Sequence, residues 1–220
     1  MRILPAAALA LLAPLPAQAC GVALALMIDV SGSVDTAEYR LQMGGLSAAL
    51  RDGLVADALI AEEAAVTVVQ WSGKSRQAVV VPWRRLDSIE AADAFAAAVD
   101  AAPRAWRNYS TGIGEALLFT ANLFAKVPEC ERRVIDVSGD GKSNEGSDPS
   151  DLRDALAASG FVINGLAIRS DVDDLGAYYR AAVIAGEAAF VMTANGFDDY
   201  PKVIKRKLIR EVTKQVAQAD

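Results

Sequence analysis

The feature that most constrains the fold is an apolar run, residues 23–28, that ends abruptly in Asp29-Val30-Ser31-Gly32-Ser33. A continuous apolar run of this length is typical of a strand covered on both faces, as in the parallel sheet of an α/β domain. Such sheets bind ligands just beyond the carboxyl ends of their strands. Asp29, Ser31 and Ser33 place three oxygens at that edge. The pattern predicts either a site for a hard cation such as Mg²⁺ or a simple turn into the next helix.

The composition excludes several kinds of site and partner. The 220 residues are 53% hydrophobic, which is enough for one well-cored domain. Histidine is absent, so a Ser-His-Asp triad, a Cys-His pair and a His-ligated zinc are ruled out, and two cysteines are too few for a Cys₄ site. The formal net charge is −6 and there is no basic stripe, so we expect no nucleic-acid partner.

Residues 1–19 have the pattern of a secretory signal peptide, which leaves 20–220 as the folded domain. A short positive start is followed by the apolar segment 3–16 and the small-x-small sequence 17–19. The segment is too short and too interrupted by proline to be kept as a membrane span, and no other segment approaches that length. We therefore expect a periplasmic or secreted protein. Lipid attachment at Cys20 is the alternative, although Ala17 and Gln18 fit a lipoprotein signal poorly.

The two cysteines each precede an expected strand. Cys20 lies before the first strand and Cys130 before the strand at 133–138. If those strands are parallel neighbours, both thiols lie at the same edge of the sheet. Disulfides persist in exported proteins, so we predict a Cys20–Cys130 bridge in preference to free thiols. Its long loop corresponds to an upper figure of about 4–5 kcal/mol in the entropic account.

Strands and helices alternate along the rest of the chain. Further strands are expected at 66–71, 78–81, 133–138, 161–168 and 188–192, and helices after Asp35 and at 86–101, 112–126, 151–159, 171–182 (capped by Asp171) and 198–218. The short turn at 72–75 predicts an antiparallel hairpin. The fold class predicted is a doubly wound α/β domain with a mostly parallel six-stranded sheet, one antiparallel edge strand and helices on both faces.

Periodicity and capping refine three of these helices. Apolar residues follow helical spacing at Tyr39, Met43, Leu46 and Leu50, and Gln42 lies off that stripe. Ser110 or Thr111 is placed to cap the helix that follows. The last helix carries five basic residues, which we expect on a solvated face: Lys202, Lys205, Arg206, Lys207 and Arg210.

Two glycine-rich stretches look like phosphate loops, and we reject both. Residues 112–114 hold two glycines two apart, but no strand directly precedes them and the third glycine is missing. Residues 139–143 end in Gly-Lys-Ser after a strand. However, Asp136 stands where the Walker A pattern requires its first glycine.

Three loops together resemble the von Willebrand factor A domain. The segments are D-V-S-G-S after an apolar strand, T-G-I-G-E-A-L at a helix start and G-D-G after a later strand. The resemblance extends from Val22 to the final helix. The phrases W-S-G, V-P-W, I-D-V-S-G-D-G and I-N-G-L-A-I are similar to a bacterial family of exported, functionally uncharacterised A-domain proteins. One departure is Gly139, because many A domains have threonine before the aspartate of the third loop.

This resemblance implies a metal-ion-dependent adhesion site. Ser31, Ser33 and Thr111 would coordinate Mg²⁺ or Mn²⁺ directly or through water, with Asp29 and Asp140 as the carboxylates. Two carboxylates balance the charge of the cation, and its remaining positions keep water that an Asp or Glu of a protein partner can displace. The resemblance therefore implies an exported binding or adhesion module and not an enzyme.

A Mg²⁺-dependent hydrolase at the same edge is the alternative. A haloacid-dehalogenase-type phosphatase needs a second aspartate two residues after the first, where Ser31 stands. A serine nucleophile needs a base, and Lys74 and Lys142 are the only nearby candidates in the sequence.

Asp136 lies inside an expected strand and is not explained by the motif. Strand alternation places Asp136, Ser138 and Asp140 on one side, with Asp136 deeper than the rim. A charged carboxylate there needs hydrogen bonds or a partner charge. We favour a structural role for Asp136 over support of the metal ligands.

Overall fold

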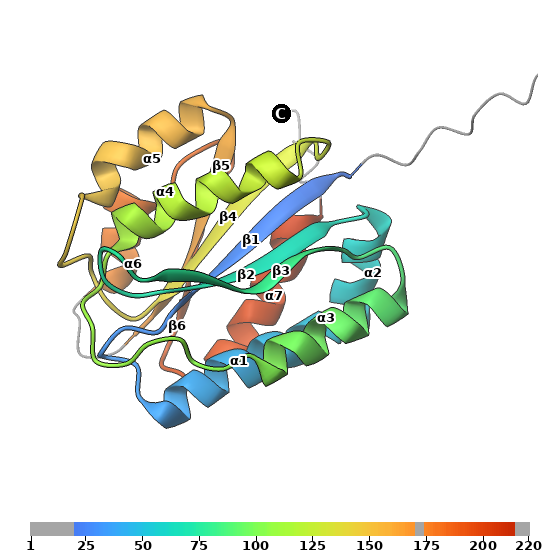
Figure 1. Cartoon of the computed structure of the whole chain (residues 1–220), viewed down its shortest axis with the longest axis horizontal. Coiled ribbons are helices and arrows are strands. Elements are labelled where there is room, and N and C mark those ends of the chain that lie inside the picture. The colour runs from blue at the N-terminus through green and yellow to red at the C-terminus, as the bar shows by residue number, and fades with distance from the viewer. Residues whose placement is uncertain (1–19, 170–173, 214–220) are drawn as a thin grey trace, which may run out of the picture.

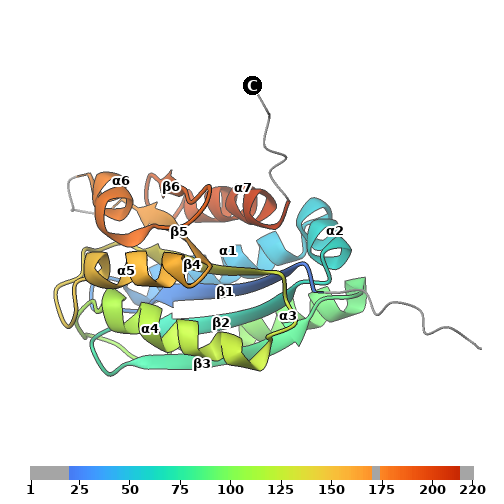
Figure 2. The ribbon, with the colours of Figure 1, turned by 90° about the horizontal axis from the view of Figure 1, so that it is seen from above.

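The computed structural model describes residues 20–169 and 174–213, and a six-stranded sheet is its central element (Figure 1). The strand order is β3-β2-β1-β4-β5-β6, which can be followed in Figure 2. All neighbours pair in parallel except β2 and β3, which are antiparallel. The predicted fold class is therefore confirmed. The strands are β1 (Val22–Asp29), β2 (Ala65–Trp71), β3 (Gln77–Arg85), β4 (Arg132–Gly139), β5 (Phe161–Ile168) and β6 (Val191–Ala194).

Helices cover both faces of this sheet. Figure 1 shows α4 and α5 on one side and α1, α3 and α7 on the other. The helical segments are α1 (Thr36–Leu50), α2 (Gly53–Ala61), α3 (Ile89–Ala101), α4 (Ile113–Leu123), η1 (Phe124–Lys126), α5 (Pro149–Ala158), α6 (Leu175–Tyr178), η2 (Tyr179–Val183) and α7 (Tyr200–Val212).

The alternation of β1 explains why its whole length is apolar. Leu24, Leu26 and Ile28 join the core beneath α1, α2, α3 and α7, whereas the residues between them join the core beneath α4 and η2. Because both faces are buried, a central parallel strand shows no polar alternation. The apolar stripe of α1 is buried as predicted. Gln42, expected off the stripe, is buried as well and donates to the Asp29 carbonyl oxygen.

Several element boundaries differ from the sequence expectations. Helix α2 was missed, although Asp52 caps it and Val55 and Leu59 are buried one turn apart. Helix α3 begins after Ser88, whose hydroxyl accepts from the Ala91 amide, and not at 86. Strand β3 is longer than predicted and tolerates Pro82 because it is an edge strand.

The last third of the chain shows similar shifts. Strand β6 lies three residues later than its expected start. The helix expected at 171–182 is described from its cap at Asp174, and Asp171 lies outside the described residues. The last helix spans Tyr200–Val212, and residues 214–218 of its expected range are likewise not described.

The prediction that the basic residues of α7 lie on a solvated face is wrong for Lys207. Its side chain is fully buried, with the Nζ atom 2.7 Å from Asp136 Oδ1 and 2.5 Å from Glu211 Oε1. Asn164 Nδ2 donates to the same Glu211 oxygen at 3.0 Å. The free-energy cost of burying this cation is offset by two carboxylates that are themselves buried. Lys202 and Arg206 are exposed, as expected.

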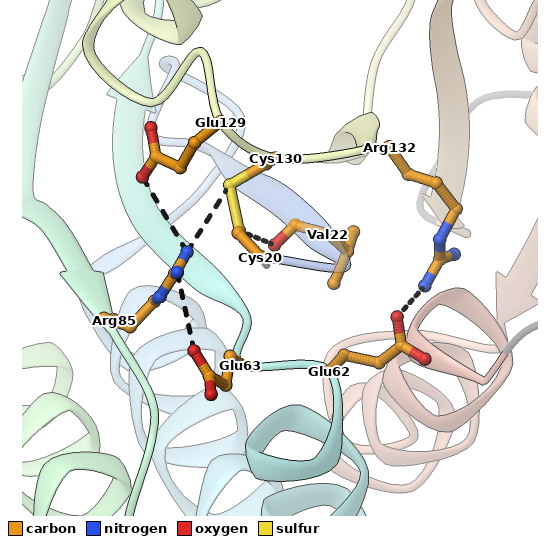
Figure 3. The surroundings of a disulfide bond; sticks show 8 residues. All are labelled: Cys20, Val22, Glu62, Glu63, Arg85, Glu129, Cys130 and Arg132. Atoms are coloured by element: carbon orange, nitrogen blue, oxygen red, sulfur yellow. Dashed lines mark hydrogen bonds and ion pairs between the residues drawn. A yellow bond between two sulfur atoms is a disulfide. The ribbon is translucent and has the colours of Figure 1, made fainter. Parts of the chain in front are cut away.

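A disulfide joins Cys20 to Cys130, as predicted, across a sequence separation of 110 positions. It lies before β1 and β4, which are parallel neighbours, at the amino edge of the sheet. Figure 3 shows Arg85 beside it, between Glu129 at 3.7 Å and Glu63 at 3.5 Å. These partly exposed ion pairs contribute little individually.

The expected signal peptide, residues 1–19, lies outside the described residues. Within 20–169 and 174–213, no helix is long and apolar enough to cross a membrane.

Candidate metal site

Four of the five predicted site residues are linked by a chain of hydrogen bonds at the carboxyl edge of β1 and β4. Asp29 ends β1, and its Oδ1 accepts from the Ser31 amide at 2.8 Å. The Ser31 and Ser33 hydroxyls lie 3.2 Å apart. Ser33 Oγ then donates to Asp140 Oδ1 at 2.7 Å, although the two residues are 107 positions apart in the sequence. The first and third predicted loops therefore meet.

Thr111 comes from the second loop and is brought to the same edge by contacts of its backbone. Its amide donates to Asn144 Oδ1 at 2.9 Å, and its carbonyl accepts from the Asn144 amide at 2.8 Å. The expected capping role of Ser110 or Thr111 is wrong, because α4 begins after Gly112 without a side-chain cap from its own loop. Ser143 supplies that bond instead, accepting from the Ile113 amide. The Thr111 hydroxyl is thus not used to cap the helix.

The predicted residues line or underlie a hollow of about 730 Å³. Ser33, Thr111 and Asp140 line it, whereas Asp29 and Ser31 are buried and are not among its lining residues. Two exposed cations, Lys142 and Arg169, also line it. The remaining lining residues are Gly32, Glu38, Tyr109, Gly141, Ser143, Asn144, Gly196 and Phe197.

The two carboxylates are buried close to one another. Burial, and secondly the charge of Asp140, raise the pKa of Asp29 to about 7, against the hydrogen bonds from Ser31. Burial raises the pKa of Asp140 too, and the hydrogen bond from Ser33 opposes this. A divalent cation would hold both groups in their ionised form. Two carboxylates and three hydroxyls offer only oxygen donors, so the residues fit a hard cation.

No cluster of three or more His, Cys, Asp or Glu side chains that could hold a metal occurs among the described residues. The candidate site therefore depends on hydroxyl oxygens in addition to Asp29 and Asp140.

Arg104, which sequence reasoning missed, holds the first loop through hydrogen bonds to its backbone carbonyls. Its Nη2 donates to the carbonyl oxygens of Val30 at 3.0 Å, Ser31 at 3.0 Å and Val34 at 2.7 Å. Nη1 donates to the Asp35 carbonyl at 3.2 Å. One planar guanidinium therefore satisfies the carbonyls of a turn that has no strand partner. Nothing near Arg104 in the sequence indicates this, because its targets lie about 70 residues earlier.

Asp136 is not part of the site. It is buried in β4, and its ion pair is with Lys207 of α7 and not with a predicted ligand. This supports the structural role that we favoured from the sequence.

Comparisons with known proteins identify a family and a shared fold. A family model described as "Protein of unknown function (DUF1194)" matches residues 19–216. A search of curated proteins gives no match. Among solved structures, proximal thread matrix protein 1 from the mussel byssus matches with a TM-score of 0.67 at 16% identity, covering 86% of this chain and 47% of that chain.

Two further structures extend the comparison. A von Willebrand factor type A structure from Catenulispora acidiphila has a TM-score of 0.62 at 19% identity, with 88% of this chain and 43% of that chain covered. The mussel protein with a zinc-occupied MIDAS motif has a TM-score of 0.62 at 17% identity, over 89% and 49% of the two chains. The chain thus spans about half the length of these proteins. Identities this low show a shared fold alone.

Proposed function

Because the chain belongs to the DUF1194 family of unknown function and has the von Willebrand factor A fold, we propose that it is an exported, metal-dependent binding module. It holds Mg²⁺, or Mn²⁺, with Asp29, Ser31, Ser33, Thr111 and Asp140. A protein partner docks there through an Asp or Glu side chain.

The observation that carries this proposal is the hydrogen-bond chain from Asp29 through Ser31 and Ser33 to Asp140 at one edge of the sheet. These bonds bring two distant loops together, and the side-chain atoms that they gather for a cation are all oxygens. The cation would supply a positive charge and an open coordination position. Asp29 and Asp140 would balance that charge, so a further acidic group could bind without leaving a surplus of negative charge.

The rim of the hollow also suits an acidic partner. Lys142 and Arg169 are exposed and line the cavity that Asp140 and Thr111 line. Opposite charges at a rim raise the association rate more than they raise affinity. We therefore expect partner binding to weaken in high salt.

Calorimetric titration of the purified protein with MgCl₂ and MnCl₂ tests the metal site. The native chain should bind and should unfold at a higher temperature with metal, since a ligand bound only to the folded state adds stability. Asp29→Ala and Asp140→Ala should each abolish both effects and keep the fold. Asp151→Ala, which removes an exposed carboxylate on α5, is the matched control. Unchanged metal affinity in both site variants would refute the assignment.

Affinity capture from periplasmic extract tests the docking role. A partner should bind in Mg²⁺ and elute in EDTA, and Lys142→Ala should slow its association whereas Lys202→Ala, on the exposed side of α7, should not. The hydrolase alternative makes a different prediction. It requires Mg²⁺-dependent turnover of generic phosphate or peptide esters that Asp29→Ala abolishes.

A further inference from the structure

Gly139 leaves a space in the sheet directly beside the candidate metal site. It is the last residue of β4 and does not have a positive φ, so its backbone conformation does not require glycine. Space does require it. A Cβ atom at this position would lie 2.7 Å from Tyr179 Oη and 2.9 Å from Asp29 Oδ2. Tyr179 and Asp29 therefore approach the same point from η2 and from β1.

A second glycine makes room for the same tyrosine. A Cβ atom at Gly165 of β5 would lie 2.7 Å from Tyr179 Cδ1. The aromatic ring therefore lies over Gly165 and the hydroxyl over Gly139, on two strands that pair with each other. A side chain at Gly139 would displace the hydroxyl, and a side chain at Gly165 would displace the ring. The sheet is shaped to bring this hydroxyl to the carboxyl edge.

The polar atoms around this space lack partners. Asp29 Oδ2 and Tyr179 Oη are buried and have no hydrogen-bond partner among the described residues. The same holds for Trp71 Nε1 on β2, the strand next to β1. Leaving a buried donor or acceptor unsatisfied costs about 1–3 kcal/mol. A phenol hydroxyl can donate and a carboxylate oxygen can accept, so two of these atoms are complementary. Burial raises the pKa of Tyr179 well above its usual value, which keeps the hydroxyl a donor.

We propose that Tyr179 is a positioning residue for Asp29: its hydroxyl, in the space left by Gly139, holds the second carboxylate oxygen of Asp29. No direct hydrogen bond joins the two oxygens in this structure, and a small rotation of the carboxylate or one water molecule completes the contact. The Ser31 amide holds the other oxygen, so the plane of the carboxylate is set from both sides. Tyr179 thereby supplies a hydroxyl beside residue 139, where the resemblance to A domains leads one to expect a threonine.

The adjacent Tyr178 supports the same edge. Its hydroxyl accepts from the Ser143 amide at 3.1 Å, in the loop that follows Asp140. Tyr178 thus contacts the third loop, and Tyr179 lies near the point that Asp29 also approaches. A π-helical turn begins at Tyr179, and such turns occur frequently at functional sites.

The inference rests on the proposed metal site, and Tyr179→Phe tests it. The variant keeps the ring and should keep the fold, while Mn²⁺ affinity measured by calorimetry should fall about 10–100-fold, as for other groups that orient ligands. Tyr200→Phe is a matched control. Tyr200 is equally buried and also has an unpartnered hydroxyl, but it lies against the other face of the sheet in the core shared with α1 and α7. Its substitution should leave affinity unchanged.

Moving the hydroxyl gives a stricter test. Gly139→Ser combined with Tyr179→Phe places an oxygen where the phenol was removed and should recover affinity. Gly139→Ala combined with Tyr179→Phe fills the same space without a hydroxyl and should stay weak. If Tyr179→Phe binds Mn²⁺ as the native protein does while Asp29→Ala does not, the positioning role is wrong and the metal site stands.

A measurement in EDTA keeps the inference testable if the native protein binds no metal. The free energies of unfolding of Tyr179→Phe, Asp29→Asn and the double variant should be non-additive, because each substitution removes one side of the same contact. Additivity would overturn the contact between the two residues. If the native protein binds no metal but the two substitutions are non-additive, the proposed function is refuted and the contact between Tyr179 and Asp29 stands.

Discussion

Replacing Lys207 by methionine should destabilise the protein by about 3–5 kcal/mol at pH 8, the usual cost of removing one partner of a buried ion pair. Methionine has nearly the shape of the lysine stem, so packing is largely kept. What is lost is the cation 2.7 Å from Asp136 and 2.5 Å from Glu211. Two buried carboxyl groups then face each other in an apolar layer. Because the free energy of unfolding of such a domain is about 5–15 kcal/mol in total, the loss is a large share of its stability.

The size of this effect should depend on pH in a defined direction. Burial, and secondly Asp136, raise the pKa of Glu211 to about 8 in the native protein, with Lys207 and Asn164 opposing. Tyr200 also faces this group, and Arg132 binds its main-chain carbonyl. An acid with a raised folded-state pKa adds stability at low pH and loses it as pH rises through that value. Native stability should therefore fall between about pH 4.5 and pH 8, by at most about 1.4 kcal/mol per pH unit from this group.

Urea denaturation at pH 5 and pH 8 measures both effects. Lys207 lowers the pKa of Glu211, so without it this buried carboxyl group resists ionisation more strongly. The penalty of Lys207→Met should therefore be larger at pH 8 than at pH 5. Glu211→Gln keeps an acceptor for Lys207 and Asn164 while leaving Lys207 and Asp136 as a neutral pair. It should be no less stable than the native protein at pH 8. A loss below about 1 kcal/mol for Lys207→Met, or an equal loss for both variants, would refute this account of the network.

Three further predictions concern Asp136, Arg104 and the disulfide. Asp136→Asn should lower the free energy of unfolding but leave the calorimetric Mn²⁺ affinity unchanged, and a fall in affinity would restore the metal-supporting role. Arg104→Lys should weaken metal binding, because one ammonium cannot bind four carbonyls of the first loop, whereas Arg107→Lys, an exposed neighbour, should have no effect. Replacing Cys20 and Cys130 by serine should cost about 2–5 kcal/mol in urea denaturation and spare metal affinity, because the bridge is at the opposite edge of the sheet.

The fold could be predicted because its determinants are local. The apolar run before Asp29 and the runs before Asp140 and Ile168 indicate buried strands without knowledge of their neighbours. The placement of the three candidate loops at one edge of the sheet was predictable for the same reason, since each proposed ligand follows a strand or precedes a helix. Helix α2 is short and starts with glycine, a weak helix former, so its pattern was not distinct from a loop.

What escaped prediction depends on contacts between distant segments. A lysine among four other basic residues looks like part of a solvated face, and only the packing of α7 against β4 shows that Lys207 meets Asp136. Tyr179 is similar, because a tyrosine in a helix indicates core packing. Only the structure shows that Gly165 of β5 makes room for its ring and Gly139 of β4 for its hydroxyl. Helical and strand periods show which residues are buried but not which polar groups meet inside.

The two faces of β4 separate stability from binding. On one face Asp136 is paired with Lys207, so its charge is already used within the fold. On the other face, the space at Gly139 brings Tyr179 and Asp29 together without a completed hydrogen bond. Asp136→Asn should therefore change unfolding but not Mn²⁺ affinity, and Tyr179→Phe should do mainly the reverse. Combining them should add the two effects within about 0.5 kcal/mol, because the side chains share no partner. Strong non-additivity in metal affinity would show instead that β4 couples the buried network to the site.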